Sequence, residues 1–285
     1  MYNCQIVKYP HGYQVRLYDT PHELPPPGDD RLTLEKLSAL DELHRWTQED
    51  LNDPGHIFEM DQSDIDTMME NAVEQEQRSL RSSMGRTTNK VYYLARSNDW
   101  EWFFTLTFNP DLVDSFDYSE CVTKLSVWFN NMRKKCPDMK YLVVPEQHKS
   151  GRWHFHGLFA GCDALGFVDS GKKTKDGEVI YNVGKYRLGF STATRVRDPR
   201  RVTRYIGKYI TKDLCAVTKG KKRYWCSRNL AQAEVEKKYY APGELPVILE
   251  QLRDMATSVT SSTSESLGAT YYIELSEVWN DEKSQ

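Results

Sequence analysis

Trp153-His154-Phe155-His156-Gly157 is the stretch that decides the fold, because two histidines alternate in it with apolar residues. In a β-strand the side chains at positions i and i+2 leave the same face of the sheet. We therefore expect His154 and His156 to point to one side, while Phe155 points into a hydrophobic core. Two neutral imidazoles side by side form half of a metal site.

A carboxylate is expected beside these histidines. Residues 140–146 are mostly apolar and predict a strand, and residues 148–152 predict a turn. Such a hairpin places Glu146 next to the histidine strand. Two histidines and one carboxylate leave coordination positions open, which favours Mg²⁺ or Mn²⁺ holding a phosphate over a closed zinc site. His148 is a rival ligand, but it falls in the turn, where a solvated loop residue is the more ordinary interpretation.

A second group of reactive side chains lies in Arg204-Tyr205-Ile206-Gly207-Lys208-Tyr209-Ile210-Thr211-Lys212. On a helix, residues four apart share one face, so the spacing predicts that the two tyrosines stack one turn apart and that the two lysines do the same. Asp198 and Pro199 predict the start of this helix, as its N-cap and its first residue.

The chemistry of these groups fits attack on phosphorus. A phenolate is a competent nucleophile, although a tyrosine with the ordinary pKa of about 10 is mostly protonated at neutral pH. A divalent cation and nearby ammonium groups favour the reaction by stabilising negative charge. Taken alone, paired histidines on a strand and paired tyrosines on a basic helix are more often packing residues, so the argument depends on their combination.

Three segments, in order, resemble the motifs of HUH endonucleases: Phe103-Phe104-Thr105-Leu106-Thr107-Phe108, then Glu146 with His154-Phe155-His156, then Tyr205 to Lys212. More narrowly, the chain is similar to the rolling-circle replication initiators of small bacterial phages and plasmids, of the microvirus and inovirus kind. The doubled tyrosine is similar to that of the microvirus-like initiators. The resemblance covers roughly residues 80 to 215.

The resemblance implies a specific chemistry. Glu146, His154 and His156 would bind Mg²⁺ or Mn²⁺, Tyr205 and Tyr209 would be the nucleophiles, and Lys208 and Lys212 would contact phosphate. The implied reaction is metal-dependent nicking and joining of single-stranded origin DNA through a 5′-phosphotyrosine. The implied partners are single-stranded or unwound origin DNA, a host polymerase and, since no Gly-x-x-x-x-Gly-Lys-[Ser/Thr] loop for ATP is present, a host helicase.

The charge distribution supports a nucleic-acid partner, although the net charge is −3. Residues 1–80 hold 6 Lys and Arg against 17 Asp and Glu, whereas residues 120–232 hold 24 against 9. The basic block therefore coincides with the motifs, as expected for binding to a phosphate backbone. Its candidate DNA-binding residues are Arg195, Arg197, Arg200, Arg201, Arg204, Lys221, Lys222 and Arg223. Tyr224 and Trp225 are candidates for base stacking or, equally, for core packing.

Composition limits the class of protein. The six cysteines are scattered without CxxC pairs, which favours a reducing cytoplasm, here that of a bacterial host, over a zinc ribbon or disulfide framework. No run approaches the roughly 20 apolar residues of a membrane span, and no charged-then-apolar leader marks secretion, so we expect no membrane partner.

The order of expected elements predicts an α+β fold, with an antiparallel sheet and helices on one face, as in the ferredoxin-like or RRM-like core of HUH endonucleases. Four regions are expected: an N-terminal β-hairpin at 1–18, an acidic and partly flexible segment at 19–77, the catalytic domain at 78–232, and a C-terminal helix with a flexible tail at 233–285. Helices are expected at 71–97 and 119–135, a hairpin about 171–177, and a strand at 186–196.

Three alternative functions remain open. A relaxase or single-strand transposase of the HUH type shares the chemistry, although relaxases commonly carry three clustered histidines and a tyrosine near the N-terminus. A non-catalytic DNA- or RNA-binding protein would use His154 and His156 for packing only. A metal-dependent nuclease that hydrolyses with water would form no covalent intermediate with DNA.

Overall fold

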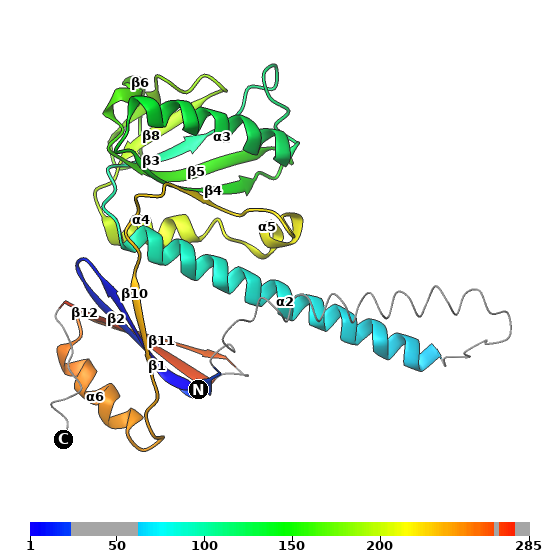
Figure 1. Cartoon of the computed structure of the whole chain (residues 1–285), viewed down its shortest axis with the longest axis vertical. Coiled ribbons are helices and arrows are strands. Elements are labelled where there is room, and N and C mark those ends of the chain that lie inside the picture. The colour runs from blue at the N-terminus through cyan, green and yellow to red at the C-terminus, as the bar shows by residue number, and fades with distance from the viewer. Residues whose placement is uncertain (24–61, 265–267, 277–285) are drawn as a thin grey trace. The chain divides into compact units, whose positions relative to one another are not determined.

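The computed structural model of the chain describes residues 1–23, 62–264 and 268–276 (Figure 1). The chain divides into two compact units, the first made of Met1–Gln75 with Val235–Gln285 and the second of Glu76–Glu234. Both contain antiparallel strand pairs and helices, so the expected α+β class is confirmed. Most of the acidic segment at 19–77 lies outside the described residues.

The first unit is built on an N-terminal hairpin. Strands β1 (Tyr2–Tyr9) and β2 (Gly12–His22) pair antiparallel. The turn between them depends on Gly12, whose φ of 124° is a conformation that side chains disfavour. The sheet order is β10-β1-β2-β12-β11, with β10 at Glu234–Lys238. Helix α6 (Leu245–Met255) contributes Ile248 and Leu252 to a core that the strands share.

The expectation of a flexible tail needs correction. Ser258–Ser264 forms strand β11, which pairs in register with β12 (Gly268–Leu275), and β12 pairs with β2. The Ser/Thr-rich composition suggested flexibility, but Val259, Thr260 and Thr263 are β-branched and suit a strand. As β11 is the last strand in the sheet order, its polar hydroxyls are tolerated there. Residues 277–285 lie outside the described residues.

The second unit is built on a sheet of order β6-β7-β8-β3-β5-β4-β9, in which every neighbouring pair is antiparallel. The strands are β3 (Trp102–Leu106), β4 (Lys140–Gln147), β5 (Trp153–Ala160), β6 (Phe167–Lys173), β7 (Val179–Val183), β8 (Ser191–Arg195) and β9 (Trp225–Cys226). The strand expected at 186–196 is shorter than predicted, since Tyr186 hydrogen-bonds back to Val183 in a turn.

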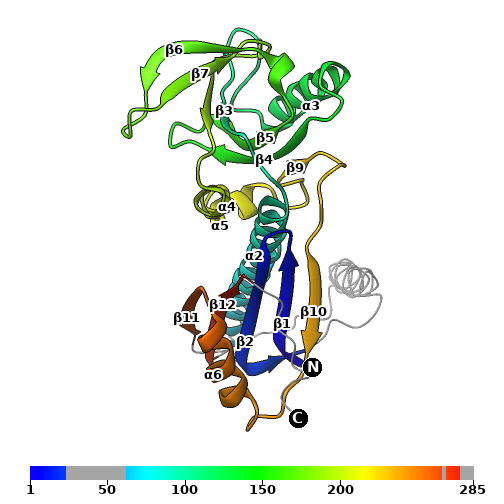
Figure 2. The same cartoon turned by 90° about the vertical axis from the view of Figure 1, so that its left-hand side faces the viewer.

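Helices lie on both faces of this sheet (Figures 1 and 2). Helix α3 (Tyr118–Lys135) covers one face, as predicted, and α4 (Pro199–Gly207) lies on the other, followed by α5 (Lys212–Val217). The last turns of α2 (Gln62–Arg96) bury Val91 and Leu94 in the same unit, and a 3₁₀ turn, η1, spans Asp163–Leu165. A second helix layer is thus added to the expected one. Among the described helices, none has the length and apolar character that a membrane span requires.

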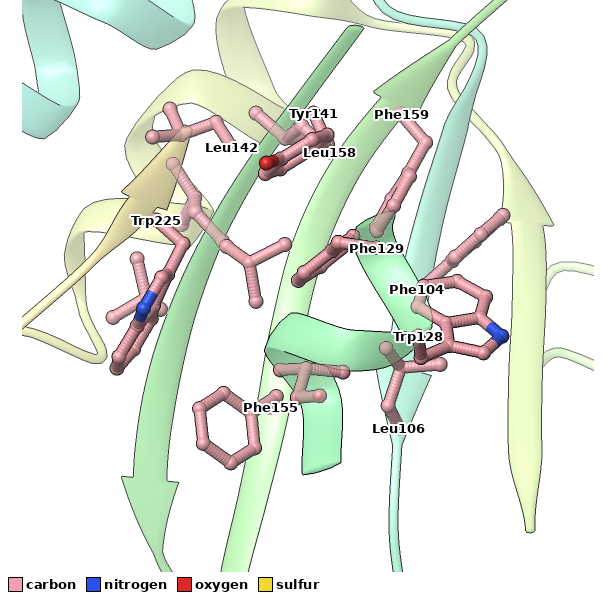
Figure 3. Packing of buried hydrophobic residues seen from close by; sticks show 14 of the residues in the cluster. Phe104, Leu106, Trp128, Phe129, Tyr141, Leu142, Phe155, Leu158, Phe159 and Trp225 are labelled. Atoms are coloured by element: carbon pink, nitrogen blue, oxygen red, sulfur yellow. The ribbon is translucent and has the colours of Figure 1, made fainter. Parts of the chain in front are cut away.

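Stacked aromatic rings form the core between α3 and the sheet (Figure 3). Phe104 and Phe159 stack with their ring centroids 4.0 Å apart, and Phe129 of α3 stacks on Tyr141 at 4.2 Å. Phe155 is fully buried on this face, as its alternation with the histidines predicts. The core therefore fixes one face of β5 and leaves the other face for the histidines.

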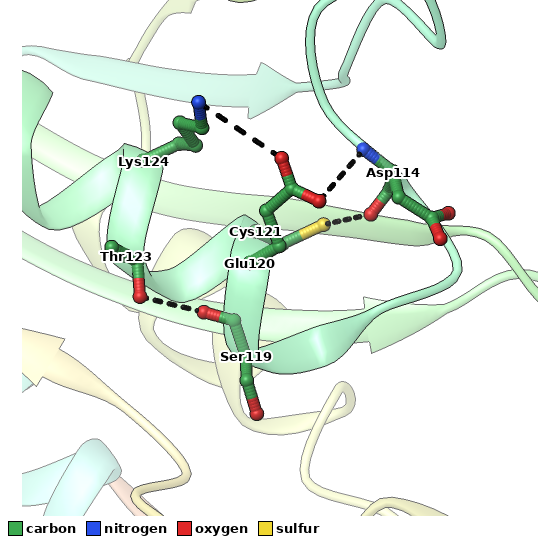
Figure 4. A network of polar contacts seen from close by, with 6 residues as sticks. All are labelled: Asp114, Ser119, Glu120, Cys121, Thr123 and Lys124. Carbon is green, nitrogen blue, oxygen red and sulfur yellow. Dashed lines mark hydrogen bonds and ion pairs between the residues drawn. The ribbon is translucent and has the colours of Figure 1, made fainter.

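The start of α3 is fixed by polar contacts with the loop before it (Figure 4). The carboxylate of Asp117 accepts from the Ser119 N–H as an N-cap. Glu120 accepts from the Asp114 N–H at 3.4 Å and pairs with Lys124 at 3.9 Å, while the Cys121 thiol donates to the Asp114 carbonyl. These contacts set the rotation of α3, so that its apolar side faces the sheet.

Candidate active site

Strand pairing brings the three candidate metal ligands together as predicted. Glu146 on β4 and His154 on β5 are cross-strand partners, and His156 lies two residues along β5 on the same face. The turn between the strands is closed by hydrogen bonds between His148 and Arg152 and between Gly151 and His148. The hairpin inferred from sequence is therefore present, with His148 exposed in its turn.

His156 is held on both ring nitrogens. Its Nε2 lies 2.7 Å from Glu146 Oε2, and its Nδ1 lies 3.2 Å from Thr105 Oγ1 on β3. Burial lowers the pKa of His156 below its usual value, against the opposing effect of the Glu146 carboxylate. The ring is therefore neutral at neutral pH, donating from Nε2 to Glu146 and accepting from the Thr105 hydroxyl. Neutral imidazole is the form that binds metals.

His154 is half-buried and stacks on His148, with ring centroids 5.4 Å apart and planes at 11°. Burial lowers the pKa of His154, and the neighbouring His148 lowers it further. Across the described residues, no three His, Cys, Asp or Glu side chains already converge as a metal site. The reason is visible at His156, whose Nε2 and the Glu146 oxygen are joined to each other.

The donor set nevertheless fits a divalent cation. Glu146, His154 and His156 leave one face of two paired strands, and both imidazoles are neutral. A cation would take the place of the proton between His156 Nε2 and Glu146 Oε2, the two atoms that already face each other. Two nitrogens and one carboxylate leave positions for phosphate oxygens.

The tyrosines lie directly against this group. The ring of Tyr209 stacks on His156, with centroids 3.9 Å apart and planes at 7°. Tyr209 donates a hydrogen bond from its hydroxyl to that of Tyr205 across 3.0 Å, and Tyr205 packs edge-on against Phe103 at 5.3 Å. The expected juxtaposition of tyrosines and histidine strand is therefore present.

The two tyrosines have different environments. Tyr205 is 42% exposed and Tyr209 is 6% exposed. Burial raises the pKa of Tyr205, but hydrogen bonds with Lys208 and Tyr209 outweigh burial and lower the pKa below its usual value. Burial raises the pKa of Tyr209, and its hydrogen bond to Tyr205 raises it further. Tyr205 is therefore the more easily ionised and the more accessible phenol.

Lys208 is the ammonium group nearest the tyrosines. Its Nζ lies 3.6 Å from the Tyr205 ring centroid and 5.0 Å from that of Tyr209. A cation here stabilises a phenolate and attracts a phosphate. Lys212 begins α5, but its side chain is outside the described part of the chain.

The expectation of one continuous helix through both tyrosines is wrong. Asp198 caps α4 and Pro199 begins it, as predicted, but α4 ends at Gly207 and Lys208 is its C-cap. Glycine is a poor helix former, and the chain turns tightly there, with the Lys208 N–H bonded to the Tyr205 carbonyl and the Ile210 N–H to that of Gly207. Thr211 then caps α5. The two tyrosines still meet, but Tyr209 reaches Tyr205 from this turn.

The basic residues fall into two groups. Near Tyr205, the Arg195 guanidinium lies 3.9 Å from the Trp102 ring centroid, Arg197 pairs with Glu178 at 2.6 Å, and the N–H groups of Arg200 and Arg201 bond to Asp198. The side chains of Arg200, Arg201 and Arg204 are exposed.

The second basic group serves packing as well. Arg223 donates to Ser83, to the Thr218 hydroxyl and to the Cys215 carbonyl, which ties the loop after α5 to α2. Lys221 and Lys222 lie over the rings of Tyr118 and Trp225 at 5.6 and 6.0 Å. Trp225 is buried in the core, so of the two interpretations of this residue packing is the one observed.

Sequence reasoning missed the roles of two residues on β3. Phe103 packs against both Tyr205 and His156, and Thr105 bonds to His156. The available signal was the alternation along β3, which places Phe103 and Thr105 on one face. What it lacked was the pairing of β3 with β5, in which Thr105 lies opposite His156.

One comparison with known proteins connects this geometry to a family. Residues 101–214 match a family model described as a replication-associated protein of the ORF2 type. The match covers about two fifths of the chain and includes the histidine strand, Glu146 and both tyrosines. It supports a replication initiator protein. No curated protein and no solved structure matches the chain.

Proposed function

We propose that this chain is a metal-dependent DNA strand transferase that starts rolling-circle replication by nicking and joining single-stranded origin DNA. The observation that carries the proposal is the stacking of Tyr209 on His156 at 3.9 Å, with Tyr209 bonded to Tyr205. A phenol nucleophile and a candidate metal ligand are thereby held in one constellation, inside the segment that matches a replication-associated family.

Tyr205 is proposed as the first nucleophile. Its oxygen attacks the scissile phosphorus in line, a Tyr–O–P bond forms, and the bond from phosphorus to the 3′ oxygen breaks. The products are a 5′-phosphotyrosine and a strand with a free 3′-OH, which a polymerase can extend. The phenolic proton passes to solvent, and the departing 3′ oxygen takes up a proton in its place. The Tyr209 hydroxyl stabilises the Tyr205 oxygen as it gains charge.

The other groups bind and orient the DNA. A divalent cation, Mg²⁺ or Mn²⁺, held by Glu146, His154 and His156 would neutralise charge on the scissile phosphate. Lys208 contacts the phosphate and favours the ionised form of Tyr205, and we propose a phosphate contact for Lys212 as well. Arg200 and Arg204, exposed on α4 beside Tyr205, hold the backbone.

Tyr209 can act as a second nucleophile only after a rearrangement. In an alternating mechanism it would attack the regenerated origin while the first link is resolved. Its hydroxyl would then have to leave Tyr205, and its ring, 6% exposed, would have to turn away from His156. The closed arrangement therefore favours Tyr205 for the first cut.

The partners follow from the same chemistry. We propose that the substrate is the origin in single-stranded or unwound form, that a host helicase unwinds it, and that a host polymerase extends the 3′-OH in the bacterial cytoplasm. A relaxase or transposase of the HUH type would use the same site on different DNA ends, and only the DNA that is cut distinguishes these alternatives.

The test is covalent capture. The full chain is incubated with an oligonucleotide that contains the single-stranded origin and with Mn²⁺, and the products are measured by mass spectrometry after denaturation. We expect the protein mass to increase by that of the 3′ DNA fragment. Cut DNA without an adduct would instead indicate hydrolysis by water, and binding without cutting would indicate a non-catalytic protein. An adduct that persists in the double variant Tyr205→Phe, Tyr209→Phe would remove the nucleophile assignment.

A further inference from the structure

A hollow of about 370 Å³ opens directly beside Tyr205. Phe103 and Tyr205 line one side, Thr194 of β8 and Arg201 of α4 line another, and Asp176 and Glu178 come from the β6–β7 hairpin. The volume is within the range of small-ligand sites, roughly 300–1,000 Å³. The hollow is separate from the side chains that hold the phosphate in the proposed reaction.

Several contacts hold the walls of the hollow in place. Thr194 is the cross-strand partner of Phe103, and Phe103 packs edge-on against Tyr205. The ion pair between Arg197 and Glu178 at 2.6 Å joins the end of β8 to β7. The stacking of the Arg195 guanidinium on Trp102 fixes the strand that lies between them.

The charges in the hollow determine what it can bind. Its lining includes three guanidinium groups and three carboxylates: Arg195, Arg197, Arg201, Asp176, Glu178 and Asp198. Charges in this balance do not favour a phosphate, because the carboxylates repel it. They suit a neutral, flat group with both donors and acceptors on its edge, next to an aromatic side chain. A nucleobase has these properties.

We infer that this hollow binds the nucleobase next to the scissile phosphate, so that the chain reads one base of the origin directly beside the cut. The inference rests on the proposed function, since the base is carried there by the strand whose phosphate Tyr205 attacks. The backbone follows the exposed Arg200 and Arg204, and the base turns inward against Phe103. Direct contact with Asp176 or Glu178 would favour bases that carry an amino group.

The experiment uses the full chain, Mn²⁺ and the origin oligonucleotide from the capture assay. A series of oligonucleotides lacks one base at a time at positions around the cut, with the backbone intact. For each protein, the rate of adduct formation on the intact oligonucleotide is divided by the rate on each abasic one. We expect this ratio to reach about 10 or more in the unmodified chain at one position flanking the cut, the effect of losing one stacked base.

Two variants connect that ratio to the hollow. Thr194→Phe fills the space, so it should slow the reaction on intact DNA and bring the ratio close to 1. Arg201→Ala should also lower the ratio. Its matched control is Arg200→Ala, which removes the same charge from the same turn of α4 outside the hollow. The control should weaken DNA binding in the same way and keep the full ratio.

The outcomes are distinguishable. Adduct formation that is insensitive to every abasic position near the cut would overturn the pocket and leave the proposed function standing. So would a full ratio in Thr194→Phe. If Thr194→Phe is inactive on all DNA, Arg201→Ala against Arg200→Ala decides, and equal ratios in these two would reject the pocket. Absence of adduct on every oligonucleotide would instead reject the proposed function.

Discussion

Tyr209 donates its hydroxyl proton to the Tyr205 oxygen across 3.0 Å while its ring lies flat on His156. This relationship gives the two tyrosines different roles in one site. Tyr205 is exposed to DNA and has a lowered pKa, whereas Tyr209 is buried and has a raised pKa. The spacing of the tyrosines made them look equivalent, but their surroundings make them unequal.

The first prediction separates these roles. Tyr205→Phe should abolish adduct formation in the first cut. Tyr209→Phe keeps the ring on His156 and removes the donated hydrogen bond, so it should slow the first cut by about 10- to 100-fold, as for a hydrogen bond to a charged group. Peptide mapping of the adduct checks both. A DNA-modified Tyr209 in the Tyr205→Phe variant, formed at the rate of the unmodified chain, would show that the nucleophiles are interchangeable.

The second prediction concerns pH and Lys208. Burial raises the pKa of Tyr205, but Lys208 and Tyr209 lower it to a net value below the usual one. Removing the ammonium group in Lys208→Met should raise that pKa. The rate of single-turnover cleavage, which increases as Tyr205 ionises, should then increase at higher pH than in the unmodified chain. Lys208→Arg keeps the charge and should keep the profile nearer to the original. Identical profiles for Lys208→Met and the unmodified chain would contradict this role.

The third prediction concerns the metal. EDTA should abolish cleavage and Mn²⁺ should restore it. Thr105→Val removes the hydroxyl that bonds to His156 Nδ1 and keeps the shape of the side chain. Partners that orient a metal ligand typically contribute 10- to 100-fold to metal affinity. We therefore expect Thr105→Val to need about that much more Mn²⁺ for half-maximal cleavage.

The control for this prediction is a threonine outside the site. Thr123→Val removes a hydroxyl that bonds only within the first turns of α3, to the Ser119 carbonyl. The Mn²⁺ requirement should not change in this variant. An equal change in both variants would mean that the effect comes from stability and not from the orientation of His156.

The fourth prediction tests the core under the histidine strand. Phe104 is fully buried and stacks on Phe159 at 4.0 Å. Phe104→Ala should lower the free energy of unfolding by about 3–5 kcal/mol, the usual cost of such a cavity. Phe190→Ala is the comparison, since Phe190 is 55% exposed and should change stability little. Denaturant unfolding of both variants measures the difference.

Sequence alone predicted those parts of the fold that depend on local patterns. The alternation in 153–157 predicted β5 and its two faces, and Asp198 with Pro199 predicted the start of α4. The spacing of apolar residues predicted α3, whose buried side includes Leu125 and Trp128. Each of these signals is contained within a few neighbouring residues.

What sequence could not predict depends on long-range pairing. The Ser/Thr-rich stretch Ser258–Ser264 is ordered as β11 because β12 provides a partner strand, and β12 in turn pairs with the N-terminal hairpin. The end of α4 at Gly207 and the burial of Tyr209 both depend on packing against the sheet. The same applies to Thr105, whose contact with His156 exists only because β3 pairs with β5.

The last prediction separates basic residues that hold DNA from those that hold the fold. Arg204 is exposed beside Tyr205, whereas Arg223 donates to Ser83, Thr218 and Cys215. For a single strand, each phosphate contact contributes about 0.7 to the slope of log affinity against log salt. Arg204→Ala should therefore reduce that slope by about 0.7 and leave the melting temperature nearly unchanged.

Arg223→Ala should show the opposite pattern. It leaves partly buried polar groups without their donor, which costs about 1–3 kcal/mol, so the melting temperature should decrease while the salt slope is retained. Fluorescence anisotropy with a labelled oligonucleotide at several salt concentrations gives the slopes, and thermal unfolding gives the stability. A reduced slope in Arg223→Ala at unchanged stability would return this residue to the DNA-binding surface that its position in the basic block first suggested.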